Sequence, residues 1–184
     1  MKNLFFCIVL LLAGGCFSGY RQTVEIDLTR SELPGQRIMP SARIGVIRNN
    51  SGAGLPLMIR HKDGLVETDK YARWILSPEQ LLERELHRTL TATDAPAVRL
   101  SGNVLTCEFD AVRKEAILEV SFEAKKDKVF RQIRKTFCVP VAWPQKNDPV
   151  LRASALSKAM SECFQKACFA AADLIEEVQK THEI

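Results

Sequence analysis

Two neighbouring segments alternate between apolar and polar residues so regularly that they restrict the fold more than any other feature of this chain. In residues 103–111 one face carries Leu105, Cys107, Phe109 and Ala111, and in residues 115–123 one face carries Ala116, Leu118, Val120 and Phe122. A period of two is typical of a strand with one buried face, and only a short polar connection separates the two segments. The sequence therefore predicts an antiparallel hairpin, followed by a longer and less regular strand over residues 129–141.

Further strands are predicted before this hairpin. Residues 24–28 alternate, and residues 42–47 form a short apolar run whose character predicts a central place in the sheet. Residues 57–61 lead into a turn at Lys62-Asp63-Gly64, after which residues 65–68 return as a short partner strand.

Two amphipathic helices are predicted. Ser77 suits an N-cap, Pro78 the first helical position, and Gln80 completes a capping box. Leucines then recur every four residues at Leu82, Leu86 and Leu90. From Val150 to Lys180 an apolar stripe predicts a long helix on the sheet, broken near its start; it contains Leu156, Met160, Cys163, Ala167, Ala170, Leu174 and Val178. The fold class is α/β, with a mixed, largely antiparallel sheet packed by a central helix and a long C-terminal helix.

The N-terminal segment is typical of an exported protein. Lys2 is followed by the apolar run Leu4–Leu12, which is short for a bilayer span and indicates a signal peptide over residues 1–15. Small residues then precede Cys16, as in a bacterial lipobox, although Ala13 stands where leucine is usual. We expect lipid attachment at Cys16, a lipidated tether over residues 16–22, and a single α/β periplasmic domain over residues 23–184. The alternative is ordinary signal cleavage beside a chance cysteine.

Length and charge narrow the class of function. A chain of 184 residues favours one domain, and its net charge of +4 comes from acids and bases mixed along the sequence. This distribution differs from the basic stripe of a nucleic-acid-binding protein, so we expect no nucleic acid partner.

The sequence contains no arrangement that predicts catalysis. Its three histidines (His61, His87 and His182) are scattered, and it has neither a Cys-x-x-Cys pair nor a Gly-x-Ser-x-Gly elbow. We therefore expect no enzyme activity, no metal and no cofactor. Four cysteines remain after Cys7 and Cys16, namely Cys107, Cys138, Cys163 and Cys168. Disulfides and free buried thiols both stay open, as does a periplasmic thiol-redox protein that uses Cys138 or Cys168.

An aromatic and basic cluster precedes the first helix. It consists of Arg60, Tyr71, Arg73 and Trp74. Aromatic residues and arginine are enriched in protein interfaces, so these four residues are the candidate partner-contact surface. The alternative is that Tyr71 and Trp74 hold the start of the helix against the sheet.

The same residues carry a family resemblance. Arg60, Val66-Glu67, Tyr71-Ala-Arg-Trp74, Pro78 and the leucine-spaced helix resemble the ABC-type transport auxiliary lipoprotein family, which includes the outer-membrane lipoprotein of the paraquat-inducible lipid-transport system. Glu108-Phe109 and the alanine-rich residues 153–172 fit the same pattern, and the resemblance covers most of residues 44–178. Ala13 and the four cysteines depart from it.

The resemblance implies a non-enzymatic lipoprotein, anchored in the outer membrane by its lipid and facing the periplasm. Phe17, rather than aspartate, after the cysteine agrees with the outer membrane. Its implied partners are an ABC permease, its ATPase and an MCE-type lipid-binding protein, which together move lipid between membranes, and a homo-oligomer is compatible with the family. The alternative function is a lipopolysaccharide-assembly-type lipoprotein that partners an outer-membrane β-barrel.

Overall fold

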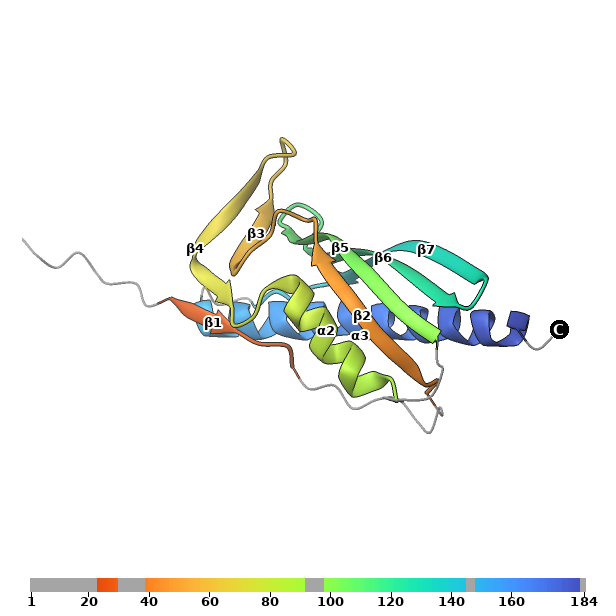
Figure 1. Cartoon of the computed structure of the whole chain (residues 1–184). Helices are drawn as coiled ribbons and strands as arrows, with labels where there is room; N and C mark the ends of the chain where they lie inside the picture. Colours follow the sequence, from red (N-terminus) through yellow and green to blue (C-terminus); the bar gives the residue numbers. More distant parts are fainter. Residues whose placement is uncertain (1–22, 30–38, 92–97, 145–147, 183–184) are drawn as a thin grey trace, which may run out of the picture.

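The structure is a computed structural model that describes residues 23–29, 39–91, 98–144 and 148–182. Seven strands in these residues form one mixed sheet, and a central helix and a long C-terminal helix pack against it, as the sequence predicts (Figure 1). The predicted signal peptide, Cys16 and the tether lie outside the described residues, so the structure leaves them as predictions.

The predicted antiparallel strands are present and form one half of the sheet. Strand β5 (Val98–Asp110) pairs with β6 (Glu115–Lys126), which pairs with β7 (Val129–Pro140). The expected face of β6 is buried, because Leu118 and Phe122 are fully inaccessible to solvent.

Strand β5 differs from the prediction in its start and in its buried face. It begins at Val98 rather than at residue 103, and its register against β6 shifts between Val104 and Thr106. This β-bulge inserts one residue, so Val104 is buried while Leu105 is only half-buried. The prediction that Leu105 shares the core face with Cys107 and Phe109 is therefore wrong.

The other edge of β5 is shared by two parallel strands. Strand β2 (Ala42–Asn49) pairs with β5 from Val98 to Val104, and β3 (Pro56–Arg60) pairs with its last two residues. The predicted central place of residues 42–47 is wrong, because β5 is the one described strand with which β2 pairs. Helix α2 packs against β2, and this contact accounts for the apolar side chains of β2.

The remaining strands complete the sheet in the order β1-β4-β3-β5-β6-β7. Strand β4 (Val66–Trp74) returns antiparallel to β3 and is longer than the expected residues 65–68. Strand β1 (Val24–Ile26) pairs in parallel with the C-terminal end of β4. Figure 1 shows the β3–β4 hairpin rising away from the rest of the sheet.

Both predicted helices are present. Helix α2 (Pro78–Thr89) follows the capping residue Ser77, whose backbone N–H donates to Gln80 Oε1 at 3.1 Å. Its residues Leu81, Leu82 and Leu86 are fully buried. The expected break near the start of the last helix is wrong, since α3 runs unbroken over Pro149–His182. Asp148 explains the clean start, because its Oδ1 accepts the N–H groups of Val150 and Leu151.

Candidate partner-contact site

Trp74 ends strand β4 and belongs to the core. It lies opposite Ile26 of β1, and its backbone N–H donates to the carbonyl of Leu55 at 2.6 Å. Only 1% of the residue is exposed. This placement agrees with the alternative in which Trp74 holds the start of α2 against the sheet, and it leaves no indole surface for a partner in this conformation.

Arg73 points away from that core. Half of its side chain is exposed, and its Nη2 lies 2.6 Å from Oε1 of Glu25 on β1. The ion pair ties the first strand to β4 at the edge of the sheet. Since both side chains are solvated, the pair contributes little to stability and leaves Arg73 accessible to a partner.

Arg60 lies at the far end of the same hairpin ladder. Its guanidinium donates to both carboxylate oxygens of Glu108, at 2.6 and 3.1 Å. This bidentate bond raises the pKa of Arg60, chiefly through hydrogen bonding and then through the charge of Glu108. The Glu108 side chain is only 7% exposed, so Arg60 neutralises a buried carboxylate and fixes the hairpin to β5.

The four predicted residues therefore do not form one surface. Arg73 pairs with Pro56 at one end of the β3–β4 ladder, and Arg60 pairs with Val66 at the other. Tyr71 lies on β4, and its side chain is outside the described part of the structure. The contact prediction stays a prediction, and Arg73 is the described member that it fits best.

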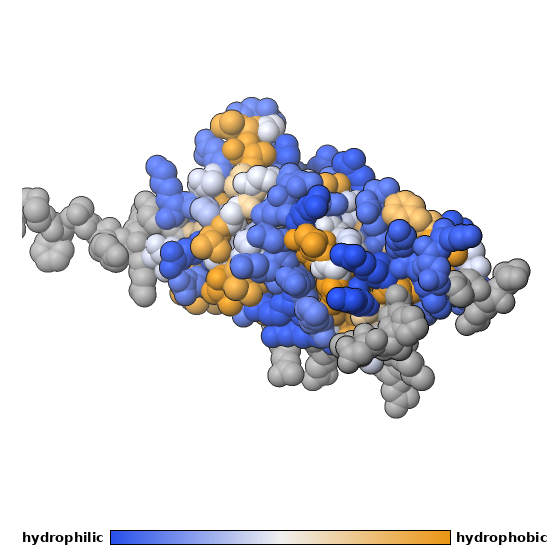
Figure 2. Space-filling view, in the orientation of Figure 1, coloured by the Kyte–Doolittle hydropathy of each residue, from blue (hydrophilic) through white to orange (hydrophobic). Residues whose placement is uncertain are grey.

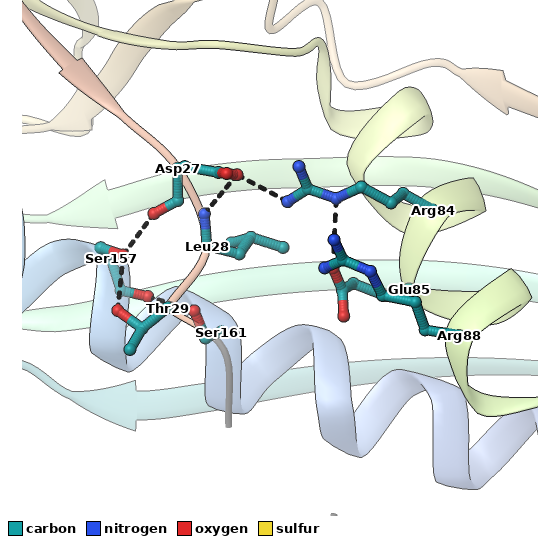
Figure 3. Close-up of polar contacts among 8 residues, drawn as sticks. All are labelled: Asp27, Leu28, Thr29, Arg84, Glu85, Arg88, Ser157 and Ser161. Carbon is teal, nitrogen blue, oxygen red and sulfur yellow. Dashed lines mark hydrogen bonds and ion pairs between the residues drawn. The ribbon is translucent and has the colours of Figure 1, made fainter. Parts of the chain in front are cut away.

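A polar network that sequence reasoning missed fixes the point where the chain enters the domain (Figure 3). Asp27, directly after β1, accepts from Arg84 of α2 at 2.6 Å and from the N–H of Leu28 at 2.7 Å. The Ser157 hydroxyl of α3 donates to the Asp27 carbonyl and lies 2.8 Å from the Thr29 hydroxyl. Arg84 and Ser157 lie 57 and 130 positions after Asp27 in the sequence. No local sequence pattern indicates contacts between residues so far apart.

The network controls the ionisation of Asp27. Partial burial alone would raise its pKa, but the hydrogen bonds from Arg84 and Leu28 and the charges of Arg84 and Arg88 together lower the pKa below its usual value. Arg84 is held in turn by Glu85, which also accepts from Arg88 at 2.8 Å. The carboxylate therefore stays ionised and ties β1 to α2, while the backbone carbonyl of Asp27 makes the contact with α3.

All four cysteines of the domain are free thiols in the structure. Cys138 is exposed on β7, whereas Cys107, Cys163 and Cys168 are buried. Burial raises the pKa of each of these three thiols to about 12. A reactive thiolate is therefore strongly disfavoured at Cys168, one of the two residues that a thiol-redox function would use.

Two further features are absent from the described residues. They contain no group of three or more His, Cys, Asp or Glu side chains placed to hold a metal ion. No helix among them is both long enough and apolar enough to cross a bilayer.

The class that this architecture defines is a mixed α/β sheet domain with a long C-terminal helix, and solved structures share it. The crystal structure of a Xanthomonas campestris protein of the family model DUF330 superposes with a TM-score of 0.63 at 15% identity, over 89% of this chain and 100% of that chain. The crystal structure of an uncharacterized protein gives 0.55 at 9% identity, over 86% and 98%. At these identities the likeness shows the fold alone. Neither a family model nor a curated protein matches the sequence.

Proposed function

We propose that this protein is a non-enzymatic lipoprotein, anchored by lipid on Cys16 in the outer membrane, that assists an ABC/MCE-type system in moving lipid between membranes. The observation that carries the proposal is the N-terminal pattern, in which an apolar segment and small residues lead to Cys16. The family resemblance, which covers most of residues 44–178, supports the transport role. The fold likeness to the DUF330 structure, which covers all of that chain, is compatible with it.

The arrangement of β1 supports an anchored domain. Val24, the first residue of β1, lies eight positions after Cys16 in the sequence. An extended chain of that length reaches at most about 28 Å, so a lipid on Cys16 would keep the domain close to the bilayer. The ladder to β4 and the Asp27 contacts then transmit any pull on the tether to the sheet and to both helices.

Lipid labelling tests the anchor. The full precursor is expressed in a Gram-negative host with an alkyne analogue of palmitate, and Cys16→Ser is compared with the matched control Cys7→Ser inside the predicted signal peptide. We expect Cys16→Ser to lose the label and to leave the membrane fraction, because the acyl chains provide the membrane affinity. We expect Cys7→Ser to keep both the label and its place in the membrane fraction. Full labelling of the Cys16→Ser protein would rule out this anchor.

Crosslinking of the anchored protein tests the transport role. We expect recovery of an MCE-type protein or an ABC permease, identified by mass spectrometry. Recovery of an outer-membrane β-barrel without either of these would support the lipopolysaccharide-assembly alternative and contradict the proposal.

Separation of the inner and outer membranes by density tests the location of the labelled protein. Its presence in the inner-membrane fraction would exclude the outer-membrane location.

A further inference from the structure

A row of positive charges crosses the face of the sheet that is turned away from the helices. The ladder registers align Arg43 of β2 with Arg99 of β5 and Arg99 with Lys125 of β6. All three side chains are exposed, while their neighbours on the opposite face, Leu100 and Ala124, are fully buried. Adjacent strands lie about 4.8 Å apart, so three cations share a span of roughly 10 Å.

This row is unfavourable for the isolated domain. Like charges directly opposite each other in a sheet repel and lower its stability. Several other arginines of the domain do pair with acids, as at Arg60, Arg73 and Arg84. Within the residues that the structure describes, none of the three row cations makes an ion pair. Glu123, the acid of the next row, lies opposite Ser101 and forms no ion pair within the same residues.

The row continues onto an exposed aromatic residue. Lys125 lies opposite Phe130 of the outer strand β7, and 49% of Phe130 is exposed. Arginine and aromatic residues dominate the binding energy of protein interfaces. In Figure 2 strongly hydrophilic side chains gather over the part of the surface where Figure 1 places β2 and β5.

Gly45 leaves room for this arrangement. A Cβ atom there would lie 3.1 Å from Nε of Arg99 and 2.7 Å from Oγ of Ser101. The Arg99 side chain therefore lies across the glycine, close to the sheet, where a larger residue would displace it. Gly45 lies two residues after Arg43 on β2, so the Arg99 side chain leans along the strands towards Ser101 and stays on the exposed face of the sheet.

The row is far from the point where the chain enters the domain. Asp27 contacts α3 at Ser157, whereas Arg131, next to Phe130, pairs with Glu177 of the same helix at 3.4 Å. Twenty residues of helix correspond to about 30 Å. A lipid on Cys16 would thus place the bilayer near the end of the molecule that contains β1, whereas the row is exposed near the other end.

We infer that this row, Arg43-Arg99-Lys125-Phe130, is a docking surface for an acidic protein segment. Carboxylates pair with arginine in bidentate geometry, and they would relieve the repulsion within the row. The position opposite the predicted tether favours a protein partner over the anchoring membrane. The inference rests on the proposed function only for the identity of the partner, since the surface itself follows from the sheet.

Binding of a fluorescent poly-glutamate peptide to the full-length protein, purified in detergent, tests the surface. The row variant is Arg43→Gln/Arg99→Gln/Lys125→Gln, and the matched control Lys158→Gln/Lys166→Gln/Lys180→Gln removes the same charge from α3. We expect the row variant to weaken binding about tenfold, because three modest ion pairs act together, and the control to change it less than about threefold. Circular dichroism confirms that both variants fold.

Two results would overturn the inference. Equal loss in both variants would show that net charge alone attracts the peptide. Binding of the wild-type protein to phosphatidylglycerol vesicles but not to the peptide, with loss in the row variant, would assign the row to a lipid surface instead. Neither result depends on Cys16 labelling or on recovery of transporter components, so failure of the surface and failure of the proposed function remain separate.

Discussion

Trp74 is a large apolar side chain at the junction of β4 and α2, and it is almost completely buried opposite Ile26. Replacing it by alanine removes this buried volume and leaves a cavity. We expect Trp74→Ala to lower the free energy of unfolding by about 3–5 kcal/mol. Urea denaturation followed by circular dichroism measures the change.

Arg73 provides the matched comparison one residue earlier. Its ion pair with Glu25 is exposed, so Arg73→Ala should cost less than about 1 kcal/mol while removing an accessible guanidinium. If Trp74→Ala unfolds at the same urea concentration as the wild type, its packing role is wrong. If Arg73→Ala keeps its stability but no longer crosslinks to the transporter components, the contact role belongs to Arg73.

Thiol reactivity separates the four cysteines of the domain. Cys138 is exposed, whereas burial raises the pKa of Cys107, Cys163 and Cys168 to about 12. We expect one thiol of the native protein to react rapidly with a chromogenic disulfide reagent at pH 7, and the Cys138→Ser variant to lose this fast phase. The other three should react only after unfolding. A fast phase that survives in Cys138→Ser would contradict the burial of the other three thiols.

At the scale of elements, local sequence patterns predicted the features that depend on neighbouring residues. Ser77, Pro78 and Gln80 fixed the start of α2, and strict alternation fixed the buried face of β6. The bulge after Val104 and the parallel pairing of β2 with β5 were missed, because both depend on partners that lie far away in the sequence. The same reason hid the contact of Arg60 with Glu108, which lies 48 positions away.

The Arg60–Glu108 pair joins the β3–β4 hairpin to β5, and its removal should show the cost of a lone buried charge. Arg60→Met leaves the Glu108 carboxylate buried without its partner, whereas Arg60→Met/Glu108→Gln removes both charges. We expect the single variant to be less stable than the double variant. Urea unfolding of both proteins gives the order, and a double variant that is the less stable one would contradict this role.

The contact between β1 and α2 should make stability depend on acid pH. The pKa of Asp27 is lower in the folded protein than its usual value of 3.8, so its stabilising effect is complete above that value and disappears as the pH falls below it. We expect the melting temperature of the wild type to fall more steeply below pH 4 than that of Asp27→Asn. Arg84→Gln removes a main cause of the shift and should flatten the same part of the curve. Parallel curves for all three proteins would contradict this account.

At the scale of the whole molecule, the position of β1 defines where the folded domain begins. Ile26 and Leu28 are buried in the common core, and Asp27 contacts both helices. A chain that starts at residue 23 should therefore melt at the same temperature as the longer protein. A chain that starts at residue 30 loses two buried side chains, each contributing about 1.5–3 kcal/mol, together with the ladder to β4. Calorimetry of the two truncated chains measures the difference, and equal melting temperatures would place the domain boundary after β1.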